Sequence, residues 1–224
     1  MRKILKGRPT SYGLRAAPVQ ALVLAAVLTL ASSAQVSARA LRLVVLGDSL
    51  TAGFGVPPGK AFPDQLQAAL KAKGLDVAVV NAGVSGDTAE DGLTRYGWSV
   101  PPETDALIVE LGANDMLRGF PPEMTKKALA AILDKAKAAG VPVLLAGMKA
   151  APNLGPEYDR AFDAIYPELA KSSGAILYPF FLEGVAGDPK LDQPDGLHPN
   201  TAGIAAIVQR ILPDVEELLK RIGH

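Results

Sequence analysis

Short runs of apolar residues alternate with longer amphipathic stretches along the chain from about residue 41 onward. Each short run is continuous enough to be a strand buried on both faces, and each longer stretch repeats its apolar positions with a helical period. The predicted strands contain residues 43–46, 77–80, 105–111, 141–146 and 175–178. The predicted helices span about 61–73, 88–96, 121–140, 157–171 and 199–220. This alternation predicts one doubly wound α/β domain, with a parallel sheet covered by helices on both faces.

Residues 1–38 follow a different pattern, which is typical of a secretory signal peptide. Five basic residues and no acidic residue occupy the first fifteen positions, an apolar segment covers 21–31, and small residues lead to Ala38 and Ala40. The alternative is an uncleaved membrane anchor, but the apolar segment has about 11 residues where a spanning helix needs about 20. We therefore expect cleavage near Ala38 or Ala40, a mature domain of residues 41–224, and export to the periplasm or the medium without stable membrane insertion.

Composition narrows the chemistry that this domain can carry out. Of the 224 residues, 49% are hydrophobic, and 23 Lys and Arg balance 23 Asp and Glu, so no excess of positive charge is available for nucleic acid. The chain has no cysteine, which excludes disulfides, a thiolate nucleophile and a cysteine-ligated metal. It has two histidines, His198 and the terminal His224, so an ordered imidazole has one realistic candidate, His198.

Polar residues with complementary chemistry occur where the predicted strands end. Ser49 follows the first strand, Gly83 the second and Asn114 the third, while Asp195 and His198 precede the last helix. The carboxyl ends of parallel strands share one edge of the sheet, where ligands bind. There Ser49 could attack a carbonyl, His198 could take its proton, and Asp195 could orient the imidazole. The N–H groups of Ser49 and Gly83 and the amide of Asn114 could stabilise the oxyanion.

Taken singly, each of these residues also has an ordinary structural explanation. His198 could simply start the last helix with Asn200 or Thr201 as its cap, and Asp195 could belong to a turn. Asn114 could cap the turn that follows it, and Asp48 could cap or brace its own loop without any part in proton transfer. The coincidence of a nucleophile, a base with its orienting group and oxyanion donors at one sheet edge favours a catalytic site.

Four segments resemble the four sequence blocks of the SGNH, or GDSL-type, hydrolases: residues 47–50 (GDSL), Gly83, residues 112–115 (GAND) and residues 195–198 (DGLH). The resemblance implies a flavodoxin-like three-layer α/β/α sandwich with a five-stranded parallel sheet in the order 2-1-3-4-5. It also implies Ser49 as the nucleophile, Gly83 and Asn114 in the oxyanion hole, and an Asp195–His198 pair.

Residues 81–88 and 178–182, together with the short loops, are similar to those of exported bacterial arylesterases, acyl-CoA thioesterases and lysophospholipases. That similarity implies a serine esterase or thioesterase for short to medium acyl chains, acting on small-molecule substrates. It further implies no cofactor, no metal and a monomeric protein.

The acyl-binding region is less well defined by the sequence. The apolar loop after the fourth strand lies at the active edge, and Met148, Pro152 and Leu154 are its predicted groove residues. Phe180 and Phe181 could also line a groove, but packing in the core explains them at least as well.

Two rival functions remain open on the sequence. A flavodoxin-like module could bind FMN or another phosphate, since residues 47–55 are rich in glycine, but neither G-x-G-x-x-G nor G-x-x-x-x-G-K-[ST] occurs. A carbohydrate esterase could remove acetyl groups from a polysaccharide with the same catalytic residues. A single tryptophan, Trp98, and 5% aromatic residues offer few platforms for sugars, which favours the acyl ester over the carbohydrate.

Overall fold

The computed structural model describes residue 7 and residues 39–223, and the predicted signal peptide lies outside the described residues. Residues from Ala40 onward form one compact unit. Five strands make an all-parallel sheet in the order β2-β1-β3-β4-β5, which confirms the predicted topology. The strands are β1 Leu41–Gly47, β2 Val77–Gly83, β3 Ala106–Glu110, β4 Val143–Ala146 and β5 Ile176–Tyr178.

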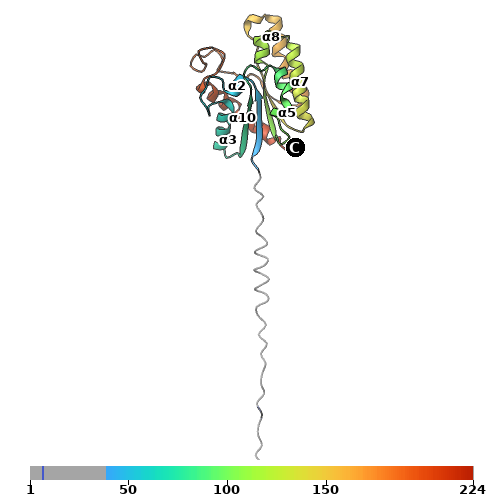
Figure 1. Ribbon diagram of the computed structural model, residues 1–224, viewed down its shortest axis with the longest axis vertical. Helices are drawn as coiled ribbons and strands as arrows, with labels where there is room; N and C mark the ends of the chain where they lie inside the picture. Colours follow the sequence, from blue (N-terminus) through green and yellow to red (C-terminus); the bar gives the residue numbers. More distant parts are fainter. Residues whose placement is uncertain (1–6, 8–38, 224) are drawn as a thin grey trace, which may run out of the picture. The chain divides into compact units, whose positions relative to one another are not determined.

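Helices cover both faces of this sheet (Figure 1). They are α2 Ser49–Ala52, α3 Phe62–Ala72, α4 Ala89–Thr94, α5 Tyr96–Ser99, α6 Ala113–Leu117, α7 Pro122–Ala138, α8 Pro156–Asp163, α9 Ile165–Ser173 and α10 Thr201–Lys220, with the 3₁₀ turn η1 Pro152–Leu154. Helix α3 packs against α10, whereas α7 packs against α4 and α9. The three predicted layers are therefore present. The chain reverses its direction of winding between β1 and β3, and such a reversal opens a crevice at the carboxyl edge.

Two features of the helices differ from the prediction. The helix expected over 157–171 is divided into α8 and α9 at Ala164. Pro167 accounts for the break, because it has no N–H to donate to the carbonyl of Asp163. Short helical turns also follow β1 and β3, where the sequence pattern indicated only loops. Both turns lie at the carboxyl edge, so they carry Ser49 and Asn114 on helical backbone.

The core is built from strand residues with no exposure and from the inner faces of α3, α7, α9 and α10. Phe181 is fully buried, and its ring meets that of Phe62 edge-on with centroids 5.0 Å apart. The packing explanation for Phe181 is thus confirmed. Lys149 lies over the half-buried ring of Phe180, 5.0 Å from its centroid.

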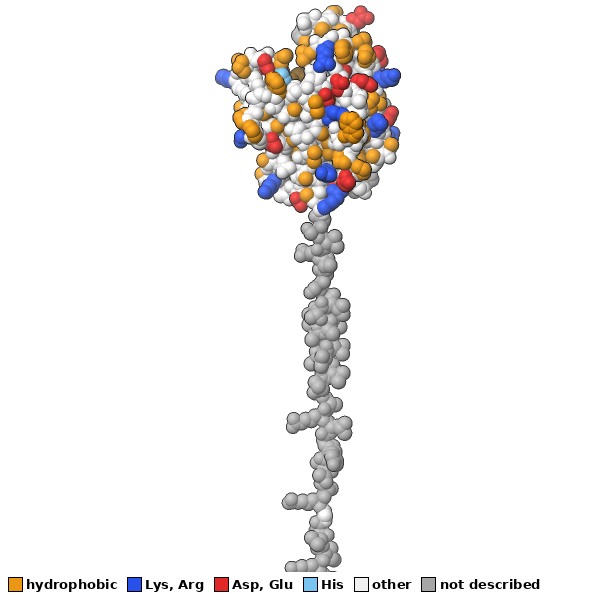
Figure 2. All heavy atoms as spheres, in the orientation of Figure 1, with side chains coloured by type: hydrophobic (Ala, Val, Ile, Leu, Met, Phe, Trp, Pro, Cys, Tyr) orange, Lys and Arg blue, Asp and Glu red, His pale blue; other side chains and the backbone are white. Residues whose placement is uncertain are grey.

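The visible surface carries charges of both signs, dispersed among apolar side chains (Figure 2). Among the helices of the described residues, none is long and apolar enough to cross a membrane.

Candidate active site

Three of the predicted site residues form one continuous hydrogen-bonded chain. The Oγ of Ser49 lies 2.9 Å from Nε2 of His198, and Nδ1 of His198 lies 2.7 Å from Oδ2 of Asp195. An ionised carboxylate can only accept, so the proton of a neutral imidazole belongs on Nδ1 and Nε2 is left to accept from the serine hydroxyl. This is the arrangement that base-assisted attack by a serine requires.

Ser49 is the first residue of α2, and the turn is capped by the residue before it. The Oδ1 of Asp48 accepts from the N–H of Leu50 at 3.0 Å, which confirms the capping role considered for Asp48. The first N–H groups of a helix have no acceptor within the helix. Among the described residues, nothing accepts from the N–H of Ser49 either. A backbone donor is therefore available beside the serine hydroxyl.

His198 and Asp195 are held by the backbone just before α10. The carboxylate of Asp195 accepts from the N–H groups of Leu197 and His198 at 2.9 and 3.1 Å, as well as from the imidazole. These two backbone hydrogen bonds, followed by the one from the His198 ring, lower the pKa of Asp195 to about 2. Asn200 caps α10 by accepting from the N–H groups of Ala202 and Gly203, so the cap predicted from the sequence coexists with the catalytic geometry.

Asn114 reaches the same place from α6. Its Nδ2 donates to Oδ2 of Asp48 at 3.0 Å and to the backbone carbonyl of Asp87 at 3.0 Å. Both hydrogens of the amide therefore point at the junction of the loops that follow β1 and β2. The amide is oriented by these acceptors, and one hydrogen would have to turn toward a substrate oxygen that enters between them.

The backbone N–H of Gly83 already has an acceptor, so it is not available to a substrate oxygen at this junction. Gly83 is the last residue of β2, and its N–H donates to Oδ1 of Asn81 at 3.0 Å. A Cβ at Gly83 would lie 2.3 Å from the backbone nitrogen of Ala52, so the glycine allows α2 to pack on the end of the strand. The prediction that its N–H faces the oxyanion is not supported by this arrangement.

Gly86 was not singled out from the sequence, although it stands one residue before Asp87. It has a φ of +89°, and its carbonyl accepts from Nη2 of Arg118 at 2.7 Å. Within the part of the chain that the structure describes, no group accepts from its N–H. The signal in the sequence was a glycine at the carboxyl end of β2. Two glycines, 83 and 86, occur there, and either could supply the oxyanion N–H.

Two buried carboxyl groups lie against α2, the helical turn that begins with Ser49. Asp48 has no exposure, and burial raises its pKa to about 6 despite the hydrogen bonds from Leu50 and Asn114. Glu110 is fully buried as well, and burial followed by the nearby charge of Asp48 raises its pKa well above the usual range. The Oε2 of Glu110 accepts from Oγ1 of Thr51 at 2.7 Å. These carboxyl groups brace β1, β3 and α2 against each other.

The predicted groove residues differ in how far the structure describes them. Met148 is 3% exposed and belongs to the core, so its predicted place in an open groove is not supported. Leu154 is half-buried in η1, and the side chain of Pro152 lies outside the described residues.

Other exposed apolar side chains lie beside His198 or on the segments that carry Gly86 and Asn114. The ring of Phe54 is 4.6 Å from that of His198, Leu197 precedes His198, Val84 donates its N–H to the carbonyl of Gly47, and Leu117 ends α6. All four are about half exposed. We refer to Phe54, Leu197, Val84 and Leu117 as the apolar rim. The sequence analysis did not predict the apolar rim, because isolated exposed apolar residues produce no periodic pattern.

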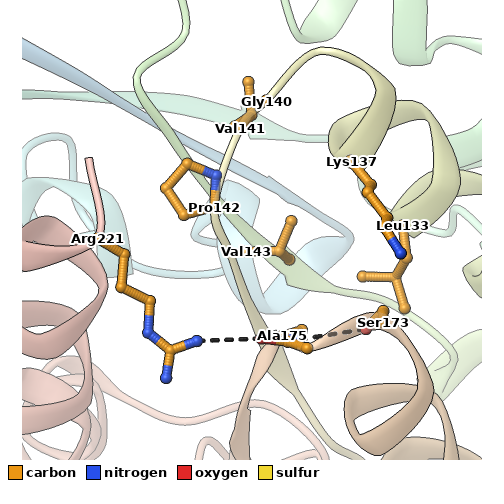
Figure 3. Close-up of a pocket in the computed structure, with 10 residues that line it drawn as sticks. Leu133, Lys137, Gly140, Val141, Pro142, Val143, Ser173, Ala175 and Arg221 are labelled. Atoms are coloured by element: carbon orange, nitrogen blue, oxygen red, sulfur yellow. Dashed lines mark hydrogen bonds between the residues drawn. The ribbon is translucent and has the colours of Figure 1, made fainter. Parts of the chain in front are cut away.

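A surface cavity of about 340 Å³ lies at the opposite end of the sheet, where β4 and β5 begin (Figure 3). Arg221 lies at its edge and donates from Nη1 to the carbonyl of Gly174 at 3.0 Å. Lys137 and Arg221 face the ends of α7 and α9, where a positive charge is favourable. This cavity has no part in the Ser49 site. The described residues also contain no cluster of three His, Cys, Asp or Glu that could hold a metal.

The chain is similar to proteins of known class. Residues 45–206 match the model of the GDSL-like Lipase/Acylhydrolase family. Esterase TesA of Pseudomonas aeruginosa is 40% identical over 202 residues, which cover 90% of this chain and 100% of TesA. Thioesterase 1/protease 1/lysophospholipase L1 of Escherichia coli K12 is 42% identical over 165 residues, 73% of this chain and 78% of that protein.

A similar fold is found among solved structures. The crystal structure of AlinE4, an SGNH-hydrolase family esterase, matches with a TM-score of 0.68 and 42% identity, covering 81% of this chain and 98% of AlinE4. The match to the family model, over residues 45–206, includes all four motif segments. This chain therefore belongs to the GDSL-like lipase/acylhydrolase family, as the resemblance of its motifs predicted.

Proposed function

We propose that the protein is a serine hydrolase that cleaves carboxylic ester or thioester bonds of short to medium acyl chains through an acyl-enzyme. The single observation that carries the proposal is the Ser49–His198–Asp195 chain, with separations of 2.9 and 2.7 Å. The similarity to an esterase and to a thioesterase/lysophospholipase supports the same class of bond.

The reaction proceeds in two half-reactions at Ser49. Its Oγ attacks the acyl carbon while Nε2 of His198 takes the hydroxyl proton, and the resulting imidazolium is stabilised by Asp195. The tetrahedral intermediate collapses as the bond to the leaving oxygen or sulfur breaks, and His198 delivers its proton to that atom. Water then attacks the acyl-enzyme with the same proton transfers, which releases the carboxylic acid and restores the serine.

The oxyanion is stabilised by the N–H groups of Ser49 and Gly86 and by the amide of Asn114. Gly86 replaces Gly83 in this role because the N–H of Gly83 is already bonded to Asn81, whereas that of Gly86 has no acceptor among the described residues. The positive φ of Gly86 turns the loop at this point. Asn114 donates to the carbonyl of Asp87, the next residue, and so approaches the Gly86 peptide.

The substrate lies against the apolar rim. Phe54 and Leu197 flank His198, which protonates the leaving group, so they are suited to contact that part of the substrate. Val84 lies in the segment that carries Gly86, and Leu117 ends α6, the helix that carries Asn114, so both are on the proposed oxyanion side. The protein acts as an exported monomer without a metal or cofactor, and the signal-like pattern of residues 1–38 supports export.

Hydrolysis of p-nitrophenyl esters from two to sixteen carbons tests the proposal. We expect activity that peaks at short to medium chains, disappears in Ser49→Ala and persists in Ser172→Ala, whose hydroxyl bonds to the carbonyl of Leu169 away from the site. Activity restricted to the acetyl ester would instead favour an acetyl esterase acting on polysaccharide. Unchanged turnover in Ser49→Ala would refute the proposed nucleophile.

A further inference from the structure

Arg95 lies between α4 and α5 with its side chain only 13% exposed, and it makes four hydrogen bonds. Its Nε donates to Oδ2 of Asp87 at 2.5 Å, and Nη2 donates to the carbonyl of Gly47 at 2.8 Å. Its Nη1 donates to the carbonyl of Ala82 at 2.9 Å and to Oγ of Ser99 at 2.8 Å. A nearly buried cation thus serves as a donor to several separate segments.

The acceptors of Arg95 belong to the segments that carry the proposed oxyanion donors. Gly47 ends β1 two residues before Ser49, and Ala82 lies near the end of β2. Asp87 follows Gly86, and its own carbonyl accepts from Asn114. The guanidinium therefore connects the nucleophile segment with the Gly86 loop, and through Asp87 it reaches Asn114.

The chemistry of arginine suits this task. The guanidinium is planar and always charged, and its N–H groups lie in a fixed fork, so it can hold several acceptors at set angles. Its two terminal nitrogens hold the carbonyls of Gly47 and Ala82, and the Gly47 carbonyl also accepts from the N–H of Val84. The carboxylate of Asp87, also 13% exposed, balances the charge of Arg95.

We propose that Arg95 is a positioning residue for catalysis, which sets the spacing between the N–H of Ser49, the N–H of Gly86 and the amide of Asn114. The inference rests on the proposed roles of Ser49 and Asn114. Arg118 differs from Arg95, since it is exposed and its one hydrogen bond to this loop goes to the carbonyl of Gly86. Because Arg95 does not touch the substrate, its removal changes the rate rather than substrate binding.

The test compares Arg95→Lys and Arg95→Ala with Arg221→Ala in the full chain. Arg221 also donates to a backbone carbonyl, that of Gly174, but at the other end of the sheet. With a p-nitrophenyl butyrate substrate, we expect both Arg95 variants to lose about 10- to 100-fold in kcat and in the acylation rate, while KM changes by less than about threefold. Arg221→Ala should keep the parental kcat.

Chemical rescue separates positioning from a general loss of structure. Millimolar guanidinium, well below denaturing concentrations, should restore part of kcat in Arg95→Ala and none in Ser49→Ala. If Arg95→Ala does not fold, Arg95→Lys decides the question by NMR, because the side-chain amide signals of Asn114 should shift in it and not in Arg221→Ala.

Parental kcat in a folded Arg95 variant would overturn the inference, and so would unchanged Asn114 signals in Arg95→Lys. A loss that guanidinium does not restore, accompanied by a lower unfolding midpoint, would also overturn it in favour of a purely structural role. Activity that survives in Ser49→Ala would instead refute the proposed function, so the two failures are distinguishable.

Discussion

The two acidic residues nearest the Ser49–His198 pair have pKa values displaced in opposite directions. Asp195 is exposed to solvent, and backbone N–H groups hold its pKa at about 2. Asp48 is buried, and the loss of solvation raises its pKa to about 6. Asp195 therefore stays ionised throughout the range in which an esterase works and does not set the acidic limit of activity. The environment of each carboxyl, rather than its residue type, determines its behaviour.

Asn114 and Asn81 provide a matched pair for testing the oxyanion donors. Asn114→Ala should lower kcat by about 10²–10³, the usual cost of one lost donor, with a small change in KM. Asn81→Ala frees the N–H of Gly83 and should leave kcat near the parental value, because Gly86 is the proposed backbone donor. Single-turnover acylation by a p-nitrophenyl ester measures both. A clear gain of kcat in Asn81→Ala would return Gly83 to consideration, because the freed N–H would then be assisting the reaction.

Phe54 and Leu154 test two locations for the substrate. Phe54→Ala removes the ring next to His198 and should raise KM for esters with large leaving groups several-fold. Leu154→Ala should leave the preference for acyl length and leaving group unchanged, because among the described residues no hydrogen bond or ring contact joins this half-buried residue to Ser49 or His198. The measurement is kcat/KM over a set of acyl and aryl esters. A shift of chain-length preference in Leu154→Ala would support the groove predicted after β4.

Among the secondary-structure elements, β1, β3 and α2 meet at Glu110. Its Oε2 accepts from Thr51 on α2 and, at 3.4 Å, from the N–H of Asp48 after β1. Its Oε1 is buried without a hydrogen-bond partner among the described residues. A protonated, uncharged carboxyl is the form that suits such a position. The contribution of this junction to the free energy of unfolding therefore depends on pH, because ionisation of the buried Glu110 is unfavourable.

Stability against pH tests this junction, and its sign follows from the raised pKa of Glu110. Its unfolded-state pKa is near the usual 4.5, so the stability that it contributes is full below that pH and is lost as pH rises through the higher folded-state pKa. Glu110→Gln cannot ionise. Its free energy of unfolding relative to the parent should therefore be more favourable at pH 8 than at pH 4.5.

Urea denaturation of both proteins at the two pH values gives this comparison. Glu217→Gln, a change at a half-exposed glutamate on α10, serves as the control and should show little difference between the two pH values. An equal effect of Glu110→Gln at pH 4.5 and pH 8 would mean that Glu110 does not take up its proton as inferred.

For the molecule as a whole, the strand order places the β1 and β3 ends beside each other at the point where the winding reverses. The segments with Ser49 and Asn114 follow these two neighbouring strands. The segment with His198 directly precedes α10. The residues proposed for catalysis therefore come from widely separated parts of one compact unit that starts at Ala40.

Processing of the chain tests the predicted signal peptide. When the full chain is produced in a bacterium, mass spectrometry of the periplasmic protein should find a new N-terminus after Ala38 or Ala40. The processed protein should unfold at the same temperature as a chain begun at Ala40, since residues from Ala40 onward form their own compact unit. An intact N-terminus in the membrane fraction would support the uncleaved anchor instead.

The sequence alone predicted the order of strands and helices and the family, and it singled out Ser49, Asp195 and His198, the triplet proposed for catalysis. These are local properties, because apolar periodicity and short motifs are written in consecutive residues. The sequence did not reveal that the helix predicted over 157–171 is divided at Ala164, although Pro167 is the cause of the division. It also did not reveal the helical turns that carry Ser49 and Asn114.

Only the tertiary structure decided which glycine keeps a free N–H, that Met148 is buried, and which side chain connects the oxyanion loops. Each of these depends on contacts between distant segments. Arg95 reaches Gly47 across 48 positions and Asn114 reaches Asp48 across 66. A donor is free only when no group elsewhere accepts from it, and an apolar residue lines a groove only when nothing else covers it, so both properties arise when the segments pack.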